Sequence, residues 1–169
     1  DMPRDFTLCT AYMVEAWTTD WDSADMLRLF DRDGDYWGSF ELYAAADYTE
    51  LTVRIGKGNM LATTADVLFP FTWSRFCVLF DTVTARMAVV LNGRVLEEGV
   101  RPEIWEEDEW RPTTLDLAFG YRDGASEDTG MISQLNIFSS ALSTARMVAL
   151  TSAGGDECGA PGDYVSWED

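Results

Sequence analysis

The sequence predicts an all-β domain, a two-sheet antiparallel sandwich or jelly roll with one short helix. Three observations lead to this fold class. Alternation of residues with a period of two dominates the chain of 169 residues. Turns rich in Gly and Asp recur about every 8–12 residues. A single segment has the pattern of a helix. Many short strands joined by such turns are typical of antiparallel sandwiches and jelly rolls.

The strands are expected in the following order along the chain. The first strand is largely apolar on both of its sides, which predicts a central strand that is covered on both faces. Asn92 and Gly93 supply the positive φ angles of a two-residue hairpin turn. The expected strands are Phe6–Val14, Met26–Phe30, Phe40–Ala44, Leu51–Ile55, Trp73–Phe80, Ala85–Leu91, Arg94–Val100, Leu115–Phe119 and Met131–Phe138.

The helix is expected near residues 143–151. Ser143 is suited to the N-cap, because its hydroxyl can accept from a free backbone N–H of the first turn. Gly154 and Gly155 follow, and glycine is the residue that most often ends a helix. No repeat, linker or low-complexity tract interrupts the chain, so residues 1–169 are expected to form a single domain.

The composition excludes several classes of function. Thirty acidic and 12 basic residues give a net charge of −18, which repels the phosphates of a nucleic acid and the surface of anionic lipid. The chain has no His, so Ser-His and Cys-His nucleophile pairs and imidazole zinc sites are excluded. No apolar run reaches 18 residues, so no membrane insertion is expected. The remaining classes of function are catalysis by carboxylates, a metal bound by carboxylates, and binding without catalysis.

The cysteine count is odd. Cys9, Cys77 and Cys158 are the three cysteines of the chain. Two of them can pair in an oxidising compartment and leave the third for a partner outside the chain. Three buried free thiols in a cytosolic protein fit the count equally well.

Four stretches of the chain resemble the pentraxin and laminin G-like families. They occur in the order that these families show, and together they span nearly the whole chain. The stretches are Phe6–Thr10, Trp73–Asp81 with the hairpin Val90–Arg94, Gly130–Ser143, and Gly162–Trp167. Arg75 and Phe80 stand where the pentraxin signature has a His and a Trp, so the resemblance is to a divergent member.

The resemblance implies a concanavalin A-like jelly roll, a disulfide between Cys9 and Cys77 on neighbouring strands, and an extracellular location. Pentraxins have one strand before the equivalent of Phe6 and another after the Ser-Trp stretch, and neither is found here. We therefore expect a fragment of a longer protein. Cys158 would then pair with a cysteine in the missing part or in another subunit.

The resemblance also implies a calcium site at one face of the jelly roll. Calcium takes oxygen ligands, and two acidic loops, at residues 31–35 and 121–128, lie where pentraxins place theirs. Arg122 occupies a position where a ligand is expected, which argues against a two-metal site and leaves room for one weaker site. Both loops can equally be simple turns, because Asp and Gly favour turns. The candidate ligands are Asp33, Asp35, Asp123, Glu127 and Asp128.

Two functions from different classes follow. The first is an extracellular recognition module that binds carbohydrate or protein through loops of the jelly roll. Exposed aromatic residues, Trp37, Trp105 and Trp110 among them, could stack on sugars or anchor a protein. The second is an assembly domain of a larger extracellular or receptor complex, with no small ligand. The missing strands and Cys158 favour this alternative.

Catalysis is not expected. Glycoside hydrolases of the same architecture carry a Glu-x-Asp-x-x-Glu signature on one strand, with carboxylates on both sides of the scissile bond. Glu106 and Asp108 begin a similar pattern, but Arg111 stands where the last Glu belongs. Pro102 and Pro112 also argue against a central strand at this place.

Overall fold

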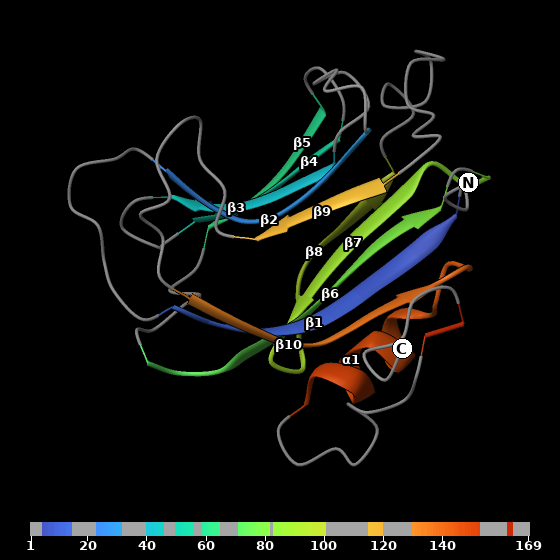
Figure 1. Cartoon of the computed structure of the whole chain (residues 1–169). Coiled ribbons are helices and arrows are strands. Elements are labelled where there is room, and N and C mark those ends of the chain that lie inside the picture. Colours follow the sequence, from blue (N-terminus) through green and yellow to red (C-terminus); the bar gives the residue numbers. More distant parts are fainter. Residues whose placement is uncertain are drawn as a thin grey trace. The chain divides into compact units, whose positions relative to one another are not determined.

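The computed structural model has the all-β architecture with one helix that the sequence predicts. It describes residues 5–14, 23–31, 40–45, 50–55, 59–64, 71–81, 83–100, 115–119, 130–152 and 162–163. These residues form two five-stranded antiparallel sheets and one helix (Figure 1). Each sheet is described by itself below. No helix in the described part of the chain is long and apolar enough to cross a bilayer.

The first sheet, sheet A, has the strand order β10-β1-β6-β7-β8. Its central strands pair in an unbroken register, in which Phe6 faces Phe80 and Tyr12 faces Ser74. The strands β6, β7 and β8 follow one another as hairpins. The bounds are β1 Phe6–Val14, β6 Ser74–Asp81, β7 Arg86–Leu91, β8 Arg94–Val100 and β10 Gly130–Phe138.

The second sheet, sheet B, has the strand order β5-β4-β3-β2-β9. Four consecutive strands form a meander, and β9 returns late in the chain to pair with β2. The pairing of β2 with β3 shifts by one residue between Asp25 and Leu27. The bounds are β2 Ser23–Asp31, β3 Phe40–Ala45, β4 Glu50–Ile55, β5 Asn59–Thr64 and β9 Leu115–Phe119.

All nine expected strands are confirmed, and β5 is a strand that the sequence did not predict. Asn59–Thr64 has no clear apolar alternation, so its own pattern does not indicate a strand. The strand forms because β4 offers a free edge, to which it pairs from Ile55 opposite Asn59 to Glu50 opposite Thr64. Pairing with a neighbour here outweighs a weak local pattern.

The helix α1, Thr144–Thr151, confirms the predicted helix. Ser143 is its N-cap, and the Ser143 hydroxyl accepts from the N–H of Arg146 at 3.3 Å. The helix ends at Ser152, whose N–H donates to the carbonyl of Val148 at 3.0 Å. It therefore stops before the glycines that were expected to end it.

Helix α1 covers one face of sheet A. Met147 and Leu150 pack against side chains of β1, β6 and β7, and each of these two residues is almost fully buried. Burial of such a side chain stabilises the fold by roughly 1.5–3 kcal/mol. The cluster under the helix consists of Cys9, Cys77, Leu79, Ala88, Val90, Met147 and Leu150.

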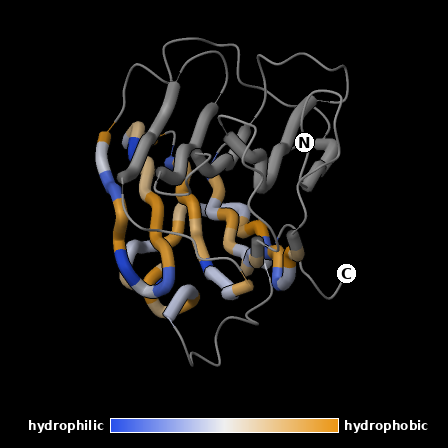
Figure 2. The backbone as a smooth tube through the Cα atoms, turned by 90° about the vertical axis from the view of Figure 1, so that its left-hand side faces the viewer, coloured by the Kyte–Doolittle hydropathy of each residue, from blue (hydrophilic) through white to orange (hydrophobic). Residues whose placement is uncertain are grey.

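The opposite face of sheet A is buried as well. Leu8, Val78 and Val89 have no exposed surface, and the rings of Phe6 and Phe80 lie 4.8 Å apart between centroids. In Figure 2 the coloured strands, which belong to sheet A, are apolar over much of their length. The prediction that the first strand is covered on both faces is confirmed, and β6 and β7 share this property.

A disulfide joins Cys9 and Cys77, as the family resemblance implied. The two residues lie directly opposite each other in the pairing of β1 with β6. The bond closes a loop with a sequence separation of 68 residues in a chain of 169, so it restricts the unfolded chain over about two fifths of its length.

We predict that the double substitution Cys9→Ala with Cys77→Ala lowers the free energy of unfolding by about 4 kcal/mol, the chain-entropy value for a loop of this length. Urea denaturation of both proteins in a Cys158→Ser background, where no third thiol can exchange, measures the difference. Equal stability of the two proteins would contradict a stabilising disulfide.

Two turns of sheet A contain residues with positive φ. The turn between β7 and β8 is formed by Asn92 and Gly93, at φ 48° and 78°, as the sequence predicts. A Cβ added at Gly93 would lie 2.6 Å from Oγ of Ser152. Ala85, before β7, has φ 53°, a conformation that a residue with a Cβ rarely adopts.

Substitutions at these two turns are expected to act in opposite directions. Gly93→Ala should lower the free energy of unfolding by about 1–2 kcal/mol, because the new Cβ adds both strain and a clash. Ala85→Gly should raise it by a few tenths to about 1 kcal/mol, because it removes strain. Thermal denaturation measures both. A change in the same direction for the two variants would show that positive φ does not control either turn.

Candidate functional site

The predicted ligand residues fall outside the residues that the structure describes. This holds for the calcium candidates, for the three tryptophans and for Cys158, and their proposed roles stay predictions. Within the described residues, no group of three or more Cys, Asp or Glu is placed to hold a metal. The residues concerned are Asp33, Asp35, Asp123, Glu127, Asp128, Trp37, Trp105, Trp110 and Cys158.

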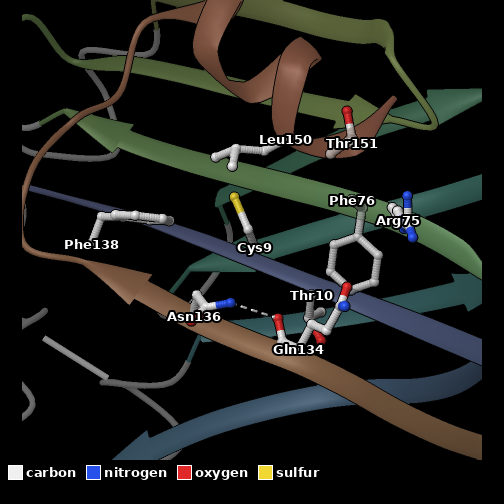
Figure 3. Close-up of a pocket in the computed structure, with 9 residues that line it drawn as sticks. All are labelled: Cys9, Thr10, Arg75, Phe76, Gln134, Asn136, Phe138, Leu150 and Thr151. Carbon is white, nitrogen blue, oxygen red and sulfur yellow. Dashed lines mark hydrogen bonds between the residues drawn. The ribbon is translucent and has the colours of Figure 1, made fainter. Parts of the chain in front are cut away.

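The described part of the chain contains a hollow beside the disulfide. It lies in sheet A under the C-terminal end of α1, and its walls come from β1, β6, β10 and α1 (Figure 3). Its enclosed part leaves about 10 Å³ for the centre of a water molecule, which is room for about one water, and the remainder opens to solvent. It is lined by Cys9, Thr10, Arg75, Phe76, Gln134, Asn136, Phe138, Leu150 and Thr151.

Arg75 on β6 joins the hairpin turn to the end of the helix. Its backbone N–H donates to Oδ1 of Asn92 at 2.8 Å, and its carbonyl accepts from the N–H of Asn92 at 2.8 Å. Nη1 of its guanidinium donates to the carbonyl of Ser152 at 3.3 Å. A cation at this place is favourable, because the last carbonyls of a helix carry partial negative charge.

Asn136 on β10 is buried, with 4% of its surface exposed. Both the nitrogen and the oxygen of its side-chain amide form hydrogen bonds. Nδ2 donates to the carbonyl of Gln134 at 3.0 Å, and Oδ1 accepts from the N–H of Gly162 at 3.1 Å. Gln134 itself has φ 55° in the middle of a strand. Asn136 therefore holds an unusual backbone segment in place and connects it to residue 162.

Two threonines of β1 fasten β10 and the segment after it. The hydroxyl of Thr10 donates to the carbonyl of Ser133 at 3.0 Å. The hydroxyl of Thr7 donates to the carbonyl of Ser140 at 3.0 Å and accepts from the N–H of Leu142 at 2.9 Å. Because both threonines are buried, these bonds offset the cost of removing the hydroxyls from water.

Asp163 holds the segment at residues 162–163 against the end of β10. Its carboxylate accepts from the hydroxyl and from the backbone N–H of Ser139. These bonds, chiefly the one from the hydroxyl, lower the pKa of Asp163 below its ordinary value of 3.8. The pKa of Asp81 is lowered in the same way, mainly by its bond from the hydroxyl of Thr84.

A second polar contact fixes the start of α1. Across the β7–β8 pair, Nε of Arg86 donates to Oε1 of Glu98 at 2.7 Å, and Nη2 of Arg86 forms a salt bridge with the same oxygen at 2.7 Å. Thr144 donates to the other carboxylate oxygen of Glu98 at 3.1 Å, and Arg86 donates to the hydroxyl of Thr144. Both ends of the helix are thus tied to sheet A by side chains.

The hollow is suited to binding and not to acid–base chemistry. Its lining has one cation, two amides and two hydroxyls, and no carboxylate. Sequence reasoning treated Arg75 only as a departure from a signature and did not select Gln134 or Asn136. The signal that could have found the last two is their spacing, because residues two apart face the same side of a strand.

Comparisons with known proteins show similarity in structure. No family model and no curated protein sequence matches the chain. The CBM40 domain of the Ruminococcus gnavus IT-sialidase, solved with α2,3-sialyllactose, is similar with a TM-score of 0.71 and 13% identity over 90% of this chain and 84% of that one. The heptameric SAP-like pentraxin from Limulus polyphemus is similar with a TM-score of 0.74 and 17% identity over 99% and 77%.

A third similar structure is the binding domain of botulinum neurotoxin DC, solved with rat synaptotagmin II. The TM-score is 0.68 with 11% identity, over 88% of this chain and 35% of that one. At such identities the similarity shows the fold alone. The predicted jelly roll, and the resemblance to the pentraxin fold, are thereby confirmed.

We predict that the backbone amide of Ser139 reports the titration of Asp163 in NMR spectra. Because the pKa of Asp163 is lowered in the folded chain, its bonds to Ser139 are complete above pH 3.8 and are lost as the pH falls through the lowered pKa. The amide resonance should therefore shift with a midpoint below 3.8, and Asp163→Asn should abolish the shift. A midpoint at or above 3.8 would contradict the contact.

Proposed function

We propose that this chain is an extracellular binding module whose ligand is a carbohydrate. The observation that carries the proposal is the fold shared over 90% of the chain with a carbohydrate-binding domain and over 99% with a pentraxin. The disulfide supports an extracellular location, because such bonds persist in oxidising compartments.

Binding without catalysis is supported by the comparisons. The similar structures include a CBM40 domain and a toxin binding domain, both of which are parts of larger proteins. We infer that this chain likewise contributes recognition.

The proposed ligand contacts are those that the sequence selects. Trp37, Trp105 and Trp110 would supply flat apolar surfaces on which sugar rings stack. The calcium site also stays part of the proposal. Asp33 and Asp35 from one loop, and Asp123, Glu127 and Asp128 from the other, would provide its oxygen ligands.

A protein ligand is the second candidate. The toxin domain was solved with synaptotagmin, and the pentraxin is heptameric, so this fold supports protein contacts in other chains. In that case the chain would serve as an assembly domain, with Cys158 as the residue that links it to a partner.

We predict that the chain binds 3′-sialyllactose saturably in isothermal titration calorimetry, and we expect a weaker response to lactose. The titrations are run once with about 5 mM calcium and once with EDTA, because a metal that binds the folded state also raises its thermal stability. Stronger binding and a higher melting temperature with calcium would support the metal site. No change in either would remove calcium from the proposal.

Tryptophan variants provide the matched comparison. Trp37→Ala, Trp105→Ala and Trp110→Ala should include at least one that weakens binding about tenfold, the loss expected for one stacked aromatic ring. Trp73→Ala is the control, since Trp73 is 44% exposed but is not among the proposed contacts. A parent chain that binds neither sugar would overturn the carbohydrate proposal. A disulfide-linked dimer on a non-reducing gel would then favour assembly.

A further inference from the structure

Arg75 brings a positive charge to the hollow beside the disulfide. A guanidinium has five N–H donors, and one bond is found for this one, from Nη1 to the carbonyl of Ser152. Within the described residues, no carboxylate lies at salt-bridge distance from Arg75. This is notable in a chain with 30 acidic and 12 basic residues. The guanidinium therefore has donors to offer to a ligand.

Gln134 lines the same hollow, and its backbone has a positive φ that is unusual for glutamine. At φ 55° a glycine or an asparagine would be the ordinary residue. The bond from Asn136 uses the backbone carbonyl of Gln134 and does not require a Gln side chain. The amide of that side chain makes no hydrogen bond to the residues that the structure describes. Backbone strain that is retained beside a hollow points to a role for the side chain.

Size and charge define what the hollow can accept. The enclosed part holds about one water, so it admits one oxygen atom and not a sugar ring. Arginine favours carboxylate oxygens, to which its N–H groups make charge-assisted bonds. The nearby C-terminus of α1 carries partial negative charge, which disfavours a dianion. A singly charged carboxylate that binds weakly meets these conditions.

We propose that this hollow is a binding site for a carboxylate group. One carboxylate oxygen enters the hollow and accepts from the guanidinium of Arg75 and from the amide of Gln134, while the rest of the ligand stays in solvent. The site is formed by β6 and β10 of sheet A and does not depend on the carbohydrate-binding function proposed above. A small organic acid and an acidic sugar both supply the required chemistry.

The test is an NMR titration of the 15N-labelled chain with sodium acetate. The side-chain Nε–Hε of Arg75 and the side-chain amide of Gln134 should shift saturably at millimolar acetate. Sodium chloride at equal ionic strength and the neutral ester methyl acetate should leave them in place. A second arm uses N-acetylneuraminic acid and its methyl ester. If N-acetylneuraminic acid binds and its methyl ester does not, the site also accepts acidic sugars. If acetate binds and N-acetylneuraminic acid does not, the site is restricted to small acids.

Variants separate ligand binding from structural support. Arg75→Lys should weaken acetate binding about tenfold, because the planar donor group is lost while the charge stays. Arg94→Lys, on an exposed residue of β8, is the matched control and should bind as the parent does. Gln134→Gly should weaken acetate binding severalfold and at the same time raise the melting temperature, since glycine accepts the positive φ. A purely structural role would not separate these two readouts.

Two results would overturn the proposal. One is the same pattern of shifts with acetate and with chloride, which would reduce the hollow to a place for water and adventitious ions. The other is unchanged acetate binding in Gln134→Gly. If Arg75→Lys fails to fold because it loses the contact to Ser152, the Gln134→Gly variant alone decides.

Discussion

The pairing of β1 with β6 is the constraint on which the rest of sheet A depends. It brings together residues that are far apart in the chain, and the disulfide between Cys9 and Cys77 fixes its register covalently. Because side chains alternate across a strand, a slip by one residue would exchange the two buried faces. Both faces are apolar here, so the hydrophobic pattern alone would specify this register weakly, and the disulfide removes the ambiguity.

The helix and the hairpin turn depend on that register in a direct way. Arg75 lies two residues before Cys77, and its position determines where Asn92 and Ser152 are held. The N–H of Gly93 in turn donates to the hydroxyl of Thr151 at 3.1 Å. The end of α1 is thus positioned by polar contacts from β6 and from the turn, while its middle is held by apolar packing. The hollow lies where these two kinds of contact meet.

The fold could be predicted from local patterns, whereas the hollow could not. The period-two alternation of residues predicted the strands. Asn92 and Gly93 predicted a turn, and both residues have the expected positive φ. Strand β5 was missed because its formation depends on the free edge of β4 and not on its own residues. The disulfide required the family resemblance, since three cysteines allow several pairings. The neighbourhood of Arg75 and Gln134 depends on tertiary contacts, and Gln134 has a backbone conformation that its residue type would not predict.

The long separation between Cys9 and Cys77 also bears on how the chain is made. At about 5–20 residues per second, a ribosome needs roughly 3–14 s to extend the chain from Cys9 to Cys77, a sequence separation of 68. During that time an apolar first strand has emerged without its partner, and its thiol cannot form the native bond. Contacts at such separation are slow to form and leave intermediates exposed to aggregation. We therefore expect the nascent chain to require protection of β1, by a chaperone or by early collapse, until β6 has been synthesised.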